Sequence, residues 1–152
     1  MNKMTQHNDI NTTEEQMVKE TYAFHKGIPG FEELKSFDLQ QHDEVFSLFS
    51  SVEEPAVAFV TVNPFDFHPD YEFELSPENV EDLGVTDPGD VEVRCIVTLH
   101  DDIRNATANL LAPIVFNKQK KWGKQIVLQN TEYKTKHALW RDEDSLNKDG
   151  DI

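Results

Sequence analysis

The alternation of apolar and polar residues over residues 91–99 constrains the fold of this chain more than any other feature. One face carries Val91, Val93, Cys95, Val97 and Leu99. The other face carries Glu92, Arg94, Ile96 and Thr98. A period of two residues predicts a half-buried β-strand, with the Cys95 side chain pointing inward.

Other parts of the chain also have the apolar and β-branched composition of strands. These segments are residues 22–26, 37–39, 45–49, 56–62, 71–75, 113–117 and 124–128. Residues 56–62 are apolar on both faces, which indicates a central strand. Residues 113–117 and 124–128 flank a polar loop with Gly123 at its end, so we expect a hairpin. Many short strands with turns between them predict a mainly β fold, a compact small β-barrel or sandwich of antiparallel strands.

Helix signals are short. Residues 76–84 begin with Ser76 as N-cap and Pro77 at the first helical position, and they end at Gly84, which predicts a two-turn helix. Residues 31–35 have the pattern of a single helical turn with Phe31 and Leu34 inward. We therefore expect one or two short helices beside the strands.

Polar composition marks both ends of the chain. Residues 1–20 are rich in Asn, Thr, Gln and Glu, and residues 141–152 are polar, with five acidic residues among the twelve. Segments of this kind cannot bury enough apolar surface to fold. We expect a flexible N-terminal tail over residues 1–20, one β domain over residues 21–140, and an acidic flexible C-terminal tail over residues 141–152.

The net charge limits the classes of partner. The chain has 152 residues, a formal net charge of −15 and one cysteine. Nucleic acids and anionic membranes would repel such a chain, so we expect neither as a direct partner. The N-terminus lacks the apolar run of a signal peptide, and no segment is apolar enough to cross a bilayer, so a cytoplasmic location is expected. A basic protein partner explains the acidity most simply.

The charge is also polarised along the chain. Residues 32–102 hold 19 acidic residues against two basic ones, a balance of −17. Residues 103–141 hold eight basic residues against one acidic residue, a balance of +7. Two interpretations follow: two solvated faces that attract each other weakly, or two surfaces of opposite sign that engage different partners.

The loop over residues 63–73 is the strongest candidate site. It carries Phe65, Phe67 and Tyr71 among acidic residues, and two prolines restrict its path. The rings could cover an open edge of the barrel, or at least one could be exposed as an interface anchor. A metal-dependent hydrolase using Asp66, His68 and Asp70 is an alternative, although a metal site normally draws three or four convergent ligands. No nucleophile motif or cofactor fingerprint occurs, so we expect no enzyme activity and no cofactor.

Several motifs together resemble the flagellar assembly factor FliW family. These are GIPGFEEL at residues 27–34, VAFVTVNPF at 57–65, PDYEFEL at 69–75, TANLLAPIV at 107–115 and GKQIVL at 123–128. They occur in the order and spacing of the family and cover residues 22–139. The resemblance implies a small cytoplasmic β-barrel-like protein without catalytic activity.

The resemblance also implies two alternating protein partners, flagellin and the RNA-binding translational regulator CsrA. In the family, free FliW holds CsrA away from flagellin mRNA, and newly made flagellin occupies FliW and so releases CsrA to repress translation. A second alternative, besides the hydrolase, is an acidic nucleic-acid mimic that competes at the RNA site. We expect the partner surfaces to be formed by two segments that lie in the recurring motifs. The predicted residues are Asn63, Pro64, Phe65, Asp66, Phe67, Asp70, Tyr71, Glu72, Asn109, Leu110, Leu111 and Pro113.

Overall fold

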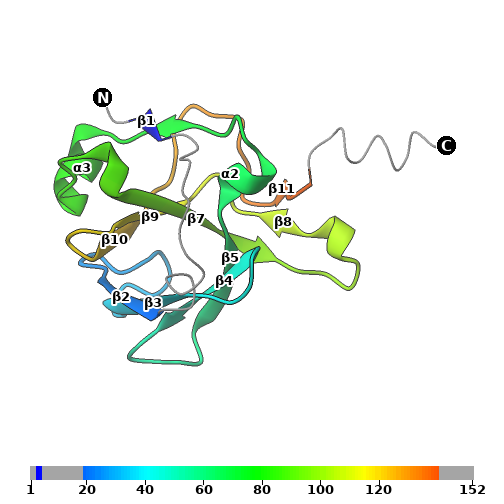
Figure 1. Ribbon diagram of the computed structural model, residues 1–152, viewed down its shortest axis with the longest axis horizontal. Coiled ribbons are helices and arrows are strands. Elements are labelled where there is room, and N and C mark those ends of the chain that lie inside the picture. Colours follow the sequence, from blue (N-terminus) through cyan, green and yellow to red (C-terminus); the bar gives the residue numbers. More distant parts are fainter. Residues whose placement is uncertain (1–2, 5–18, 141–152) are drawn as a thin grey trace.

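A closed β-barrel forms the centre of the molecule (Figure 1). The computed structural model describes residues 3–4 and 19–140. Within them the barrel strands are β2 (Lys19–Ala23), β3 (Ser36–Gln41), β4 (Phe46–Ser51), β5 (Ala58–Val62), β7 (Val91–Thr98), β9 (Ile114–Asn117) and β10 (Trp122–Gln125). Around the ring the order is β2, β3, β4, β5, β7, β9, β10. Each neighbouring pair is antiparallel except β10 and β2, which close the ring in parallel. These pairings confirm the expected mainly β fold and show that the strands form a barrel and not a sandwich.

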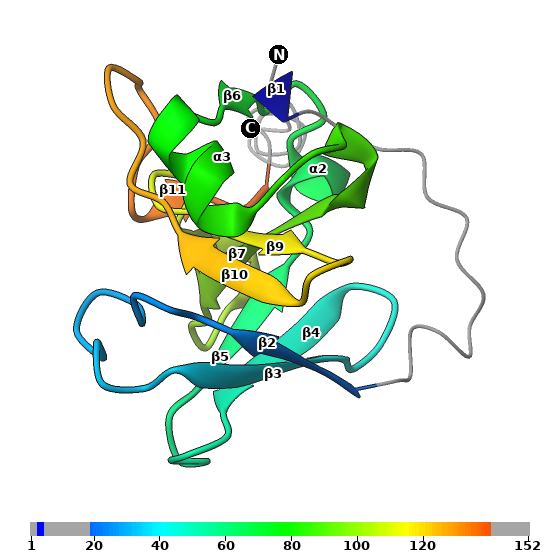
Figure 2. The same ribbon diagram turned by 90° about the vertical axis from the view of Figure 1, so that its left-hand side faces the viewer.

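The remaining elements are short and flank the barrel. They are β1 (Lys3–Met4), α2 (Pro64–Phe67), β6 (Phe73–Glu74), α3 (Pro77–Leu83), η1 (Pro88–Asp90), η2 (Ile103–Asn105), β8 (Thr107–Ala108) and β11 (His137–Ala138). β1 pairs with β6, while β8 pairs with both β7 and β11. Figure 2 shows α2, α3 and β6 on one side of the barrel and β2 and β3 on the other. In the described part of the chain, neither α-helix is long enough to span a membrane.

Two hydrophobic cores lie on opposite faces of β7. The barrel core fills the ring and contains Tyr22, Phe24, Ile28, Leu34, Phe37, Leu39, Phe49, Ile114 and Phe116. The outer core lies between the barrel wall and the flanking elements, and includes Phe65, Tyr71, Phe73, Leu75, Leu83, Val93, Cys95, Val115 and Ile126. β9 alternates its side chains between the two cores, and all four of its residues are buried. β7 presents one fully buried face to the outer core and a partly buried face to the barrel core.

The predicted inward set on residues 91–99 is confirmed for Val91 to Val97 but wrong for Leu99. Leu99 follows the last strand residue and is 48% exposed. The prediction of a half-buried strand holds on the opposite face for Glu92, Ile96 and Thr98, which are half-buried or exposed. It is wrong there for Arg94, which is only 9% exposed. Its guanidinium donates to the Glu92 carboxylate at 2.8 Å and to the Val93 carbonyl, which satisfies the buried charge.

Several other predictions are confirmed with shifted bounds. The Ser76 hydroxyl accepts a hydrogen bond from the Asn79 amide at the start of α3, and Gly84 ends the helix in the left-handed conformation, with φ of 66°. The hairpin of β9 and β10 forms in antiparallel register, although Gly123 lies within β10 rather than before it.

Several local features differ from what the sequence predicts. Residues 31–34 form a hydrogen-bonded turn instead of a helix, closed by the Leu34 amide on the Phe31 carbonyl, with Leu34 buried. The one-turn helix α2 was expected as loop. Lys19 and Glu20, assigned from sequence to the N-terminal tail, belong to β2, and Lys3–Met4 form β1. The other residues of both expected tails lie outside the described residues.

Candidate protein-binding surface

The aromatic loop begins with a capped helical turn, α2. The Asn63 side chain accepts a hydrogen bond from the Phe65 amide at 3.0 Å, and Pro64 fixes the first helical position. The His68 amide donates to the Pro64 carbonyl and closes the turn at 2.8 Å. This local geometry buries Phe65 and leaves Asp66 exposed on the next position, with Phe67 half-buried.

The buried aromatic residues of the loop anchor it to the outer core. Phe65 and Tyr71 are 3% and 2% exposed, and their ring centroids lie 5.7 Å apart. The Tyr71 hydroxyl donates to the Leu110 carbonyl at 2.8 Å. Burial raises the pKa of Tyr71 well above its ordinary value, so the hydroxyl stays protonated and keeps donating. This bond brings together the two segments predicted from sequence.

Residues 109–113 form the second predicted segment, and most of their polar groups are used internally. The Asn109 side chain accepts from the Ala112 amide at 2.9 Å, and the amides of Leu110 and Leu111 donate to the Lys134 carbonyl. Leu110 is 1% exposed, whereas Leu111 is half-buried. The segment therefore supports the loop more than it offers contact area.

Exposure divides the twelve predicted residues into three groups. Buried are Pro64, Phe65, Tyr71, Leu110 and Pro113. Half-buried are Asn63, Phe67, Asn109 and Leu111. Exposed are Asp66, Asp70 and Glu72. The buried residues can only hold the two segments in shape, and of the twelve only the exposed and half-buried ones are accessible to a partner.

Two residues that the sequence interpretation did not select extend this surface. The Trp140 ring contacts the Phe67 ring edge to face at 5.3 Å, and the Trp140 Nε1 donates to the Ile103 carbonyl at 3.0 Å. Ile103 is 49% exposed. Tryptophan is enriched at interfaces, and that preference was the available signal. We call Asp66, Phe67, Asp70, Ile103 and Trp140 the α2 surface.

The electrostatics of the α2 surface are acidic. Partial burial raises the pKa of Asp66, and the nearby Arg94 charge opposes that rise. Asp70 is exposed three positions beyond α2, and Glu72 lies at the border of the surface. Asp66 and Asp70 are exposed on the segment that carries the Phe67 ring, and this combination suits a partner that is both basic and apolar.

The three residues of the hydrolase alternative, Asp66, His68 and Asp70, differ in their surroundings. The His68 Nε2 lies 3.0 Å from the Ala138 carbonyl oxygen, and its ring stacks edge to face on His137 at 5.4 Å. Asp66 and Asp70 are both exposed. In residues 3–4 and 19–140, no three His, Cys, Asp or Glu side chains are grouped as a metal site requires.

Comparisons with known proteins agree on one family. The FliW protein family model matches residues 2–139. A flagellar assembly factor FliW of Geobacillus kaustophilus is 44% identical over 135 residues, covering 88% of this chain and 91% of the relative. One of Clostridium botulinum, strain Langeland, is 41% identical, covering 82% and 89%. A crystal structure of the flagellar assembly factor FliW matches with a TM-score of 0.77 and 42% identity, covering 91% of this chain and 97% of the other.

Proposed function

From the premise that this chain belongs to the FliW family of flagellar assembly factors, we propose that it binds flagellin and, in alternation, the translational regulator CsrA. Binding to CsrA antagonises its repression of flagellin mRNA translation. Flagellin, once made, takes the same surface and releases CsrA. The protein acts in the cytoplasm, where both partners are synthesised, and it acts by binding, without catalysis.

One observation carries this proposal: the α2 surface combines exposed carboxylates with an aromatic pair on a rigid base. Asp66 and Asp70 are exposed, while the Phe67 ring is held by contact with Trp140. The base is fixed by the hydrogen bond between Tyr71 and Leu110. A preformed surface loses little conformational entropy on binding, which favours affinity.

Each partner uses a different chemical part of the surface. CsrA binds RNA and therefore presents cationic groups, which the carboxylates attract. The same carboxylates repel RNA phosphates that approach the complex. In the FliW family, the interacting ends of flagellin are amphipathic helices. The apolar face of such a helix packs against apolar side chains of the binding protein, and Phe67 and Ile103 supply these here. Because the carboxylates and the apolar anchors belong to one small surface, either partner would block the other when bound, and their binding is mutually exclusive.

Two substitutions on the α2 surface test the proposal. We expect Asp66→Lys to weaken CsrA binding by about tenfold, since it reverses a charge at the interface. We expect Phe67→Ala to weaken flagellin binding by about tenfold or more, since it removes an aromatic anchor. Isothermal titration calorimetry with each purified partner measures both affinities.

The matched control is Glu54→Lys, which makes the same charge reversal at an exposed position in the turn between β4 and β5. This variant should keep both affinities, and thermal unfolding should show that all three variants are folded. Full retention of both partners by Asp66→Lys and Phe67→Ala would sink the proposal.

A further inference from the structure

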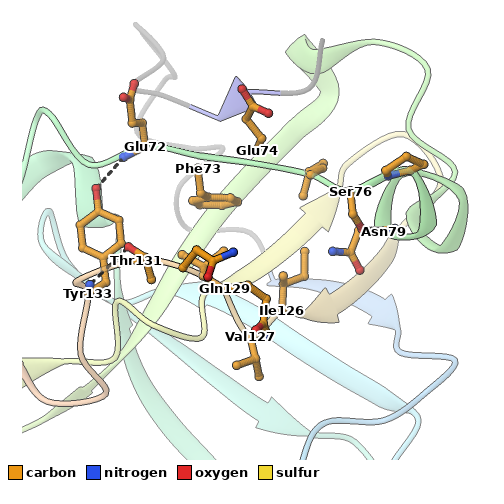
Figure 3. Close-up of a pocket in the computed structure, with 14 residues that line it drawn as sticks. Glu72, Phe73, Glu74, Ser76, Asn79, Ile126, Val127, Gln129, Thr131 and Tyr133 are labelled. Carbon is orange, nitrogen blue, oxygen red and sulfur yellow. Dashed lines mark hydrogen bonds between the residues drawn. The ribbon is translucent and has the colours of Figure 1, made fainter.

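A groove with a volume of about 520 Å³ lies between two extended segments on the outer-core side of the barrel (Figure 3). One wall is formed by residues 72–77 and includes β6; the other is formed by residues 126–131, after β10. The volume falls within the range of about 300–1,000 Å³ that is typical of ligand sites. The contacts assigned above to the α2 surface do not account for this groove.

The groove has an apolar floor and an exposed apolar rim. Phe73, Leu75 and Ile126 are 8%, 4% and 5% exposed, so they form a closed floor. Val127 is 51% exposed at the rim. In Figure 3 the Phe73 ring is directed toward Gln129, while the carboxylates of Glu72 and Glu74 leave the opposite side of the strand. A bound extended chain would place alternate side chains on the apolar floor and direct those between them outward, to the solvent side where the exposed Glu72 and Glu74 lie.

The backbone of the wall formed by residues 126–131 suits an extended polypeptide. The Ile126 amide donates to the Pro113 carbonyl and the Leu128 amide donates to the Leu111 carbonyl, both at 2.9 Å. In an extended segment the backbone groups of alternate residues point to opposite sides, so those of Val127 point away from residues 111–113. That side presents main-chain hydrogen-bonding groups to an added strand.

The other wall already has a strand neighbour on one edge. β1 pairs antiparallel with β6, so that Lys3 lies opposite Glu74 and Met4 lies opposite Phe73. The edge of β6 that β1 covers is therefore not open to an added strand.

Charge selects the kind of occupant. Among the fourteen residues that line the groove, two are glutamates and none is Lys, Arg or His. The remaining polar residues, such as Gln129 and Asn130, are neutral and can bond to a peptide backbone. We propose that this groove binds an extended segment of a partner protein in which basic residues alternate with apolar residues. This interaction goes beyond the α2 surface and does not require it.

Solution NMR with a synthetic peptide tests the proposal directly. The probe is acetyl-Lys-Val-Lys-Val-Lys-Val-amide, added to the full 15N-labelled chain, with acetyl-Glu-Val-Glu-Val-Glu-Val-amide as the comparison. We expect saturable amide shifts concentrated in residues 72–77 and 126–131 for the basic peptide only. No saturable shift, equal binding of the acidic peptide, or shifts concentrated elsewhere would overturn the proposal.

Two matched variants separate the groove from the rest of the surface. Val127→Lys should weaken binding of the basic peptide by about tenfold or more, because it places a like charge at the rim. Val52→Lys makes the same change at a valine that is 46% exposed and does not line the groove, and it should bind as the wild type does. Equal affinity of Val127→Lys and Val52→Lys would contradict the proposal.

Asp66→Lys distinguishes this result from the proposed function. The substitution alters the α2 surface and leaves the groove lining unchanged, so it should bind the basic peptide with wild-type affinity. A loss of peptide binding in Asp66→Lys would show that the peptide binds to the α2 surface, and it would refute the proposed site in the groove.

Discussion

At the residue scale, one glycine sets how closely the barrel strands approach the aromatic core. The Phe24 ring contacts the rings of Phe37, Phe49 and Phe116 at centroid distances of 5.2, 5.4 and 5.9 Å. A Cβ added to Gly123 would overlap the Phe24 ring. The sequence pattern assigned Gly123 to a turn, but its position in β10 is explained by this close approach.

Gly123→Ala should therefore destabilise the fold by about 1–3 kcal/mol, because the added methyl overpacks a closed core. Urea unfolding followed by tryptophan fluorescence measures the free energy of unfolding. The control is Gly89→Ala, where an added Cβ meets only ordinary contact with the Asp87 side chain. Similar stabilities of the two variants would contradict this explanation.

At the element scale, α3 is held to the barrel by charged side chains. The Lys124 Nζ on β10 donates to the Asp82 carboxylate at 2.6 Å and to the Asn79 side chain at 2.7 Å. The Lys26 Nζ approaches the same carboxylate at 3.0 Å. Hydrogen bonds from Lys124 and Lys26 hold the pKa of Asp82 below its usual range. The basic hairpin and the acidic helix thus attract each other within the molecule, as the simpler interpretation of the charge pattern predicts.

Removing that carboxylate charge should give a pH-dependent loss of stability. A lowered pKa in the folded state means that Asp82 stabilises the fold fully above its unfolded pKa of about 3.9 and loses this contribution as the pH falls through the lower folded value. Asp82→Asn should be less stable than the wild type at about pH 7, and the difference should shrink at about pH 3. Urea unfolding at both pH values measures it.

Asp101→Asn serves as the control for this experiment, because Asp101 is exposed in the loop that follows β7. It should change the stability little at either pH. A stability difference for Asp82→Asn that stays constant with pH would argue against the ion pair as the cause.

Local sequence patterns predicted most elements but not how the barrel closes. The alternation in residues 91–97 and the caps at Ser76 and Gly84 are local signals, and both predictions hold. Leu99 was misplaced because alternation alone does not show where a strand ends. The burial of Arg94 on the second face of β7 depends on strands far away in sequence, so the local pattern could not reveal the barrel core behind that face.

The sequence predicts the candidate site in part, as it does the fold. Sequence identified the loop and the segment that the Tyr71 hydroxyl joins. It did not distinguish the buried Phe65 from the half-buried Phe67, because both are phenylalanines flanking one acid. The one-turn helix decides which ring faces inward, and its signal is only the Asn63 and Pro64 pair. Trp140 joins the surface through tertiary contacts that no local pattern encodes.

At the scale of the whole molecule, the net charge of −15 acts over distances longer than any contact. Part of the basic stretch is neutralised internally, since Lys121 pairs with Glu20 and Lys124 pairs with Asp82. These pairs reduce the positive field of residues 103–141. A basic partner therefore meets a molecule whose long-range field is predominantly negative.

Association with CsrA should accordingly slow as salt is added. The Debye length falls from about 30 Å at 0.01 M to about 8 Å at 0.15 M ionic strength, so the long-range attraction is screened. Stopped-flow fluorescence should show an association rate constant that drops severalfold, while the dissociation rate constant changes little. A salt-independent association rate would refute electrostatic steering.

The parallel junction between β10 and β2 is a short contact between neighbouring barrel strands. β10 meets β2 through one residue pair, Trp122 with Ala23, and the Ala23 amide donates to the Lys121 carbonyl. The antiparallel junctions on either side, β2 with β3 and β9 with β10, are longer. Separating β10 from β2 breaks fewer backbone hydrogen bonds than separating either of these, so we expect local opening of the barrel to begin there. Solvent and proteases would then reach the phenylalanine interior through this opening while the other strands stay paired.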